Sequence, residues 1–193
     1  MKLIFASNSP RRIELLSKFD IDIEFVAHAF DETSIEKNIS PSNYCKLIAE
    51  GKSSSLMRKY PNIPIISADT VVVSPDNEIF EKPRDEEEAF NMLRALSEKT
   101  HKVLTGVNIL HPLEDINFTF VEKTSVKFNS LNSDTILYYI ERYSPLDKAG
   151  SYGIQDFSSI FVSSINGCYF NVVGLPLASL FYHLKKFKLI QFP

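Results

Sequence analysis

The chain has 193 residues, of which 44% are hydrophobic and 23% are charged, and its formal net charge is −3. This composition is typical of a globular protein, and the charge excludes a protein that binds nucleic acid through a strongly basic surface. The sequence contains no run of about 18 apolar residues, the length that a membrane span needs. We therefore expect a single domain over residues 1–193, with neither a nucleic acid nor a membrane as its partner.

Strands and helices are predicted to alternate along the chain, without internal repeats. In chain order, the predicted elements are a strand at Leu3–Ala6, a helix at Arg11–Phe19, a strand at Ile23–Ala27, a helix beginning near Ser42, a strand at Ile63–Val73, a helix capped by Asp85, strands at Val103–Leu110 and Phe118–Phe128, a helix capped by Ser133, a strand at Ile160–Ser164 and a helix at Pro176–Phe187. This order predicts an α/β fold, and the neighbouring strands within 103–128 add antiparallel pairing. We expect a mixed sheet flanked by helices.

The cysteines and the N-terminus indicate a cytoplasmic protein. Cys45 and Cys168 lie far apart and match no metal-binding or redox spacing, which favours a reducing compartment. After Lys2, the apolar run covers only Leu3–Ala6, which is too short for the core of a signal peptide.

The first loop, Ser7-Asn8-Ser9-Pro10-Arg11-Arg12, has the composition of an anion-binding segment. Ser9 is a suitable N-cap, and Pro10 suits the first helical position. Free N–H groups at a helix start attract anions, and arginine binds phosphate oxygens through a bidentate fork. An ordinary capped helix with two solvated arginines fits the same residues, so both interpretations stay open at this point.

Asp69 and Thr70 interrupt the apolar strand at Ile63–Val73. Under strict alternation Asp69 shares a face with Val71, where an ionised carboxylate needs a partner, a metal ion or a proton. One interpretation is a kink or bulge that turns both polar groups to water. The other is a carboxylate that binds a metal ion or accepts a proton from water.

Three more polar segments stand at predicted element ends: Asp31-Glu32, Glu81-Lys82-Pro83-Arg84, and the loop Asp147–Gln155, which holds two of the six glycines of the chain. Each of them alone is a common turn composition. Because ligands of α/β sheets bind beyond the strand ends, the cations and carboxylates together indicate a phosphorylated ligand with a divalent ion.

These segments together resemble the Maf family of nucleotide pyrophosphatases, historically called septum formation proteins. The segments that carry the resemblance are Ala6–Arg12, Glu14–Leu16, Asp31-Glu32, Ser67–Val72, Lys82-Pro83, Ala89–Leu96, His101–Val107, Asp147–Gln155 and Asn171–Leu177. They follow the family order and cover nearly the whole chain.

The resemblance implies a mixed, twisted α/β sheet flanked by helices with a deep cleft, similar to the inosine-triphosphate pyrophosphatase fold. It also implies hydrolysis of a nucleoside triphosphate to its monophosphate and pyrophosphate, with a divalent cation, Mg²⁺ or Mn²⁺. By position, Asp69 is implied to activate the water that attacks the α-phosphorus, and Glu32 and Lys82 are implied as further catalytic residues. Glu32 and Asp69 are also the implied metal ligands. The residues implied to bind the substrate are Ser7, Arg11, Arg12, Lys52, Thr70, Lys148 and Gln155.

Arg11, Thr70 and Gln155 have the residue types that resemble the dTTP/UTP type of the family, whereas members that act on 7-methyl-GTP have an aromatic residue in place of the arginine. A Gln amide can also pair with O4 and N3–H of a pyrimidine together. The chain departs from the family pattern at Glu98-Lys99 and at Asp156, where a glycine is usual. We expect the charge of Asp156, beside Gln155, to affect loop shape and base preference.

Two alternatives remain at this stage. One is a non-catalytic regulator of septum formation or cell division, and the other is a pyrophosphatase for modified nucleotides. The expected partner is a nucleoside triphosphate, and the oligomeric state is left open, with a homodimer as one option.

Overall fold

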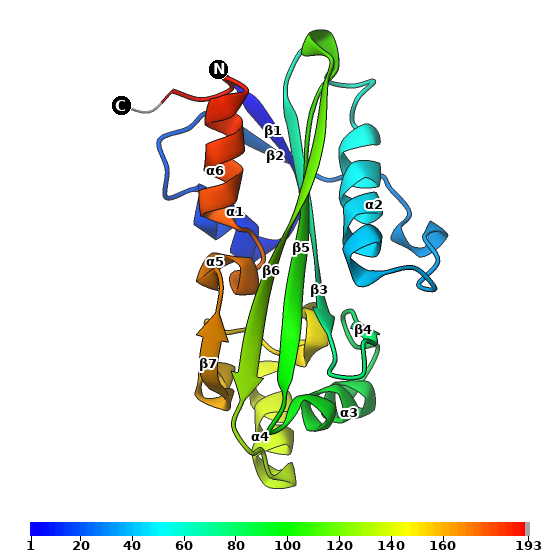
Figure 1. The fold of residues 1–193 in the computed structure, drawn as a ribbon, viewed down its shortest axis with the longest axis vertical. Helices are drawn as coiled ribbons and strands as arrows, with labels where there is room; N and C mark the ends of the chain where they lie inside the picture. The colour runs from blue at the N-terminus through cyan, green and yellow to red at the C-terminus, as the bar shows by residue number, and fades with distance from the viewer. Residues whose placement is uncertain (192–193) are drawn as a thin grey trace. The chain divides into compact units, whose positions relative to one another are not determined.

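The computed structural model describes residues 1–191, in which seven strands form one mixed sheet with helices packed on it (Figure 1). The strands are β1 (Leu3–Ala6), β2 (Ile23–Val26), β3 (Ile65–Val73), β4 (Ile79–Phe80), β5 (Thr100–His111), β6 (Ile116–Phe128) and β7 (Val162–Asn166). The helices are α1 (Pro10–Leu16), α2 (Pro41–Ser54), α3 (Glu86–Leu96), α4 (Ser133–Tyr143), α5 (Tyr169–Val173) and α6 (Leu177–Lys186). Short 3₁₀ helices are η1 (Glu32–Ser34), η2 (Pro112–Glu114), η3 (Pro145–Asp147), η4 (Ala149–Ser151) and η5 (Phe157–Phe161).

The strand order of the sheet is β2-β1-β3-β5-β6-β7, and β4 pairs with β3 outside this path. β1 runs parallel to both β2 and β3, whereas β4 is antiparallel to β3 and β7 is antiparallel to β6. All four residues of β1 are buried, as are all residues of β3 except Thr70. Strands buried on both faces are rich in apolar residues, and both of these strands were predicted from their apolar residues. The mixed α/β sheet flanked by helices is confirmed.

The chain forms two compact units and passes between them several times. The first unit contains Met1–Asp69, Thr105–Glu122 and the chain from Gly174 onward, and the second contains Thr70–Leu104 and Lys123–Val173. β3, β5 and β6 each have residues in both units. This division does not test the single domain expected from composition, which stays a prediction.

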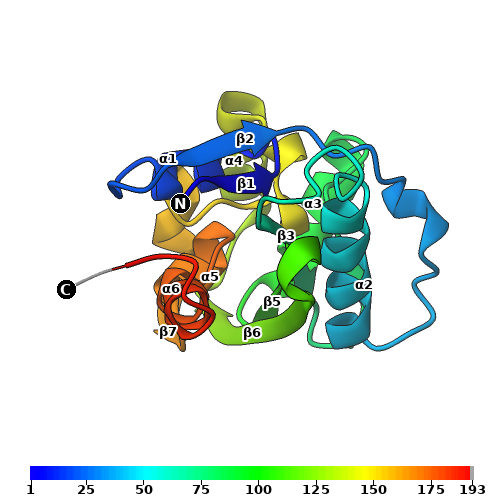
Figure 2. The ribbon, with the colours of Figure 1, turned by 90° about the horizontal axis from the view of Figure 1, so that it is seen from above.

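In the first unit, α2 and α6 pack on opposite sides of β5 and β6 (Figure 2). On the α2 side, Ser67 Oγ donates to the carbonyl oxygen of Ala49 at 2.6 Å. On the α6 side, Ser179 Oγ donates to Glu122 Oε2 at 2.6 Å. One apolar core cluster of this unit contains Ile4, Ala6, Leu56, Ile65 and Leu110.

In the second unit, α3 and α4 pack together over the ends of β5 and β6. Its core includes Leu93, Leu96, Phe128, Ile136 and Tyr139. Asp85 caps α3 as predicted, because its side chain accepts a hydrogen bond from Glu88 N at 2.8 Å. The cap of α4 is Asn132 rather than Ser133, since the Asn132 side chain accepts from Thr135 N at 2.8 Å.

Several predicted boundaries are wrong by a few residues. α1 ends at Leu16 instead of Phe19, and Ile160 belongs to η5, so that β7 begins only at Val162. β4 and α5 were not predicted at all, because elements of 2 and 5 residues are too short to show a period. None of the helices formed by residues 1–191 is long and apolar enough to cross a membrane.

Candidate active site

A lysine joins two carboxylates in the first unit. Lys52 Nζ on α2 lies 2.8 Å from Asp69 Oδ1 on β3 and 3.1 Å from Glu32 Oε2 in η1. The side chains of Lys52 and Asp69 are only 6% and 12% exposed. Asp69 therefore does not turn to water through a bulge. The ammonium group of Lys52 balances the buried charge of Asp69. Without such a partner, burial of an ionised carboxylate would cost a large free energy of desolvation.

Glu32 reaches this lysine because the segment before it is held against α2. The ring of Phe30 lies over Gly51, where even a methyl group would collide with it. The Asp31 side chain caps η1 by accepting from Thr33 N at 3.0 Å. Sequence reasoning did not single out Phe30 or Gly51, because neither residue type by itself indicates a site.

His28 is a further neighbour that the sequence did not indicate. Its Nε2 lies 3.5 Å from Glu32 Oε1. Burial, and secondly the charge of Lys52, lowers the pKa of His28. The lowered pKa favours the neutral imidazole, so His28 lies beside the Glu32 carboxylate without adding a second full positive charge.

Arg12, which follows the N-terminal loop, interacts electrostatically with the carboxylates of Asp69 and Glu32. Arg12 is buried, and its Nε donates to the carbonyl oxygen of Gly174 at 2.8 Å. Burial lowers the pKa of Arg12, while the charges of Asp69 and Glu32 oppose this effect and the charge of Arg11 adds to it. Arg12 is thus not the solvated arginine of the simpler interpretation.

Ser7 is also buried, and its Oγ accepts a hydrogen bond from Ser9 N at 3.2 Å. Arg12 Nη1 approaches the same oxygen at 3.5 Å. Ser9 occupies the N-cap position of α1, but its side chain makes no capping hydrogen bond. The serine that orders this loop is therefore Ser7.

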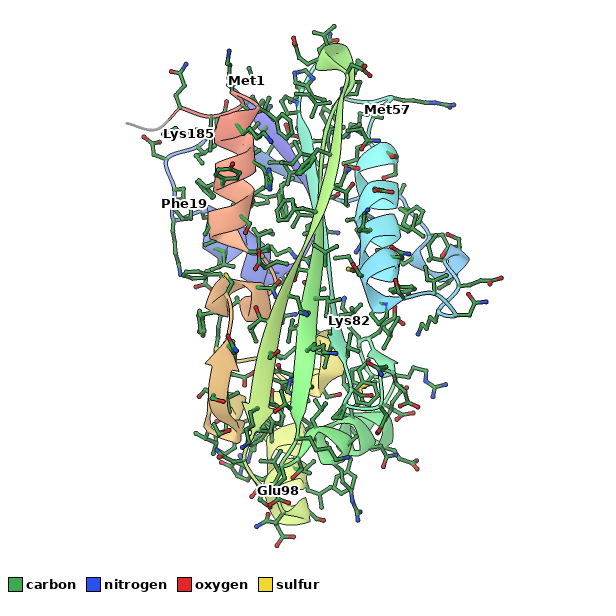
Figure 3. All side chains as sticks on the ribbon, in the orientation of Figure 1. Met1, Phe19, Met57, Lys82, Glu98 and Lys185 are labelled. Atoms are coloured by element: carbon green, nitrogen blue, oxygen red, sulfur yellow. The ribbon has the colours of Figure 1, made fainter. Side chains whose placement is uncertain are left out.

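The remaining predicted residues belong to the second unit. Thr70 follows Asp69 on β3, Lys82 is exposed between β4 and α3 (labelled in Figure 3), and Gln155 is exposed. Lys148 Nζ lies 2.8 Å from Asp147 Oδ1.

Backbone contacts tie these segments of the second unit together. Gly150 N donates to the carbonyl oxygen of Glu81 at 3.0 Å, next to Lys82. Gly150 has φ +66°, and a Cβ there would lie 2.8 Å from the side chain of Val72. The loop at 147–155 therefore packs directly on β3, two residues beyond Thr70.

The predicted sites thus form two groups, one within each unit. The first is Ser7, Arg11, Arg12, Glu32, Lys52 and Asp69, and the second is Thr70, Lys82, Lys148 and Gln155.

The donor set of the first group suits a hard divalent cation. Residues 1–191 contain no group of three or more His, Cys, Asp or Glu side chains that could hold a metal ion. Glu32 and Asp69 are two carboxylates that share Lys52 as an ion-pair partner. Mg²⁺ is typically held by one or two carboxylates together with phosphate oxygens and water, whereas zinc prefers His and Cys. The two carboxylates fit the predicted Mg²⁺ or Mn²⁺.

Comparison with known proteins gives a consistent result. A family model described as Maf-like protein matches residues 2–187. A dTTP/UTP pyrophosphatase of Clostridium perfringens is 42% identical over 189 residues, which are 97% of each chain. A dTTP/UTP pyrophosphatase of Thermosipho africanus is 46% identical over 180 residues, which are 93% of this chain and 90% of the relative.

Solved structures with a similar fold are more distant in sequence. A HAM1 protein from Coxiella burnetii has a TM-score of 0.51 at 14% identity, covering 96% of this chain and 99% of its own. A nucleoside-triphosphatase / dITP/XTP pyrophosphatase from Mycobacterium abscessus has a TM-score of 0.50 at 14% identity, with 100% of both chains covered. At this identity the likeness concerns the fold alone, and it agrees with the expected inosine-triphosphate pyrophosphatase fold.

Proposed function

The chain belongs to the Maf-like family, and on this premise we propose that it hydrolyses dTTP and UTP to the nucleoside monophosphate and pyrophosphate. The names of the curated relatives support this choice of substrates. The observation that carries the chemistry is the buried Asp69 carboxylate, held by Lys52 beside Glu32 and Arg12.

In the proposed reaction, Asp69 accepts a proton from a water molecule as that water attacks the α-phosphorus. The bond between the α-phosphorus and the bridging oxygen breaks, and pyrophosphate leaves. The ion pair with Lys52 uses Asp69 Oδ1, so Oδ2 is the atom that we assign to the proton transfer. Lys52 orients the carboxylate and balances its charge, which lets it act from a buried position.

Phosphate binding is assigned to Ser7, Arg11 and Arg12. The guanidinium of Arg12 is already fixed by Gly174, so little conformational entropy is lost when it binds a phosphate oxygen. Glu32 and Asp69 would hold the Mg²⁺ or Mn²⁺, which when bound neutralises charge on the phosphates. We assign Lys82 to the catalytic set and Thr70, Lys148 and Gln155 to substrate selection. A cytoplasmic location belongs to the same proposal.

The test of this proposal is the variant Asp69→Asn. The amide keeps the shape of the side chain and an oxygen for Lys52, but it cannot accept the proton. We expect kcat for UTP, measured by release of pyrophosphate, to fall by about 10³-fold in a variant that still folds, although the loss of one charge partner of the buried Lys52 lowers its melting temperature. The matched control is Asp115→Asn in the turn before β6, where φ is 52° and asparagine is well tolerated. Activity near that of the wild type in Asp69→Asn contradicts the assignment.

A substrate panel separates the remaining alternatives. The panel contains dTTP, UTP, CTP, 5-methyl-UTP, pseudo-UTP and 7-methyl-GTP, each with and without Mg²⁺ or Mn²⁺. We expect the highest kcat/KM for dTTP and UTP, and only with a divalent cation. A preference for a modified nucleotide favours the second alternative, and no pyrophosphate release from any substrate favours the non-catalytic regulator.

A further inference from the structure

Asp156 stands next to Gln155, and its carboxylate is the centre of a contact network in the second unit. Oδ1 accepts from Ser158 N at 2.9 Å, and the Ser158 hydroxyl oxygen lies at the same distance from it. The Tyr139 hydroxyl on α4 lies 3.2 Å from Oδ1 and 3.1 Å from Oδ2. Lys148 Nζ lies 3.8 Å from Oδ2. The carboxylate thus joins four groups that come from three separate segments of the chain.

The same network closes the turn that carries Gln155. The backbone N–H of Asp156 donates to the carbonyl oxygen of Gly153 at 3.0 Å. Ser158, which is fully buried, accepts from Gly153 N at 3.0 Å and lies 2.8 Å from the carbonyl oxygen of Gly153. Its single hydroxyl proton serves either that carbonyl or Asp156 at one time. Both ends of the turn Gly153–Asp156 are therefore tied to one buried serine.

Side chains on both sides of the turn leave it little freedom. Ile154 is 7% exposed and anchors the turn in the core, while the next residue, Gln155, is exposed. The stem of Lys148 lies over Gly153, since a Cβ there would be 2.8 Å from Lys148 Cε and 3.1 Å from Asp156 Oδ2. The turn is thus packed between the core, which Ile154 enters, and the side chain of Lys148. The charge of Lys148 is balanced by Asp147 and Asp156.

We propose that Asp156 is a positioning residue for base recognition: together with Tyr139 and Ser158 it holds the turn Gly153–Asp156 in one conformation and so fixes the backbone from which Gln155 meets the base. This inference rests on the proposed function and names a determinant of its substrate choice. A side-chain amide discriminates between bases only when its donor and acceptor are fixed in space, because a mobile amide adapts to either pattern. Fixing the turn before binding also reduces the conformational entropy that is lost on binding.

The tyrosine is suited to this role. Tyr139 is fully buried, and burial raises the pKa of its hydroxyl above the ordinary value. The group therefore stays protonated and remains a donor to the carboxylate. A glycine at position 156 would leave this donor, and the N–H of Ser158, without their partner.

The test compares Asp156→Ala with the wild type on UTP and CTP. We expect the ratio of kcat/KM for UTP to that for CTP to fall by about ten-fold, with kcat for UTP changed by less than about three-fold. Gln155→Ala should lower the ratio equally, and Asp156→Ala should add nothing in the Gln155→Ala background. Amide exchange of residues 152–158 should become faster in Asp156→Ala. An unchanged ratio, an additive double variant or unchanged exchange would overturn the proposal.

Two further variants distinguish an effect on base recognition from a general loss of stability. Tyr139→Phe removes one donor and keeps the ring in the core, so the ratio should fall in the same direction by a smaller factor. Asp85→Ala removes a capping carboxylate of α3 and should lower the melting temperature without moving the ratio. If Asp156→Ala does not fold, Tyr139→Phe decides. If the wild type hydrolyses neither dTTP nor UTP, the proposed function itself is refuted. If the wild type is active and Asp156→Ala leaves the UTP/CTP ratio of kcat/KM unchanged, only the role of Asp156 is refuted.

Discussion

At the scale of single residues, several buried polar groups of this protein have partners that are distant in the sequence. Asp69 is paired with Lys52, 17 positions earlier, and Arg12 donates to Gly174, 162 positions later. His101 also has a distant partner, outside the candidate site. It is 1% exposed, and its Nε2 lies 2.8 Å from the hydroxyl of Tyr152. Local sequence shows that such a group needs a partner, but not which residue supplies it.

His101 makes stability depend on pH. Burial lowers the pKa of His101 to about 4, below its value of about 6.5 in an unfolded chain. As the pH falls below about 6.5 the unfolded chain binds the proton first, so the native state loses stability until the pH reaches about 4. Between pH 7 and pH 4.5 we expect His101 to remove about 2 kcal/mol from the free energy of unfolding, measured by urea denaturation. His101→Asn should lack this part of the pH dependence, and an equal slope in both proteins contradicts the assignment.

At the scale of elements, α2 combines a structural and a functional role on neighbouring residues. Tyr44 and Ile48 on this helix are buried in the core, Lys52 points to the carboxylates, and Gly51 leaves room for the ring of Phe30. A helix usually loses stability through an internal glycine, by roughly 1 kcal/mol relative to alanine. Here the missing side chain lets the segment that carries Glu32 approach the helix.

Gly51→Ala should therefore be harmful although it raises helix propensity. The added methyl group displaces the Phe30 ring, and we expect a loss of about 1–3 kcal/mol in stability and at least about ten-fold in kcat, because Glu32 moves away from Lys52. Urea denaturation and pyrophosphate release measure the two effects. The control Ser54→Ala adds no such clash, and adding Phe30→Leu to Gly51→Ala should restore part of the activity. A Gly51→Ala protein that is more stable and fully active would refute this account.

At the scale of the whole molecule, three strands contribute residues to both compact units. The clusters around Ile65 in the first unit and around Leu93 in the second share no residue, but β3, β5 and β6 have residues in both units. A strand that loses its partners in one unit is weakened in the other, because the pairing continues along the same backbone. This argument supports the single domain that composition predicts.

We therefore expect one unfolding transition for both units. Cys45 is a buried thiol of the first unit, and burial raises its pKa to about 12, so that it reacts with a thiol reagent only after opening. In urea, its reactivity and the amide exchange of α3 in the second unit should show the same midpoint. Leu93→Ala should cost about 3 kcal/mol and shift both midpoints together. Two separate midpoints would contradict the single domain.

Local patterns along the chain determined much of the fold. The apolar run at Leu3–Ala6 and the apolar residues on either side of Asp69-Thr70 predicted β1 and β3. Ala89, Met92, Leu93 and Leu96 recur at helical spacing, and all four are buried on α3. The apolar side chains of Leu47 on α2 and Leu137 on α4 are nevertheless 41% and 54% exposed. A helical period shows that one face is apolar, but the neighbouring elements determine how much of that face is covered.

The sequence by itself also determined which residue types can carry the chemistry: a carboxylate within an apolar strand, two arginines after the first strand and a glycine-rich loop with Gln155. Only the tertiary structure decided that Lys52 lies between Asp69 and Glu32, and that Asp156 ties Gly153, Ser158 and Tyr139 around Gln155. Periodicity and capping depend on residues within a few positions of one another, whereas these partners are brought together by the packing of separate elements. The sequence therefore shows that a buried charge or a tight turn needs a partner, and the packing of separate elements determines which residue that partner is.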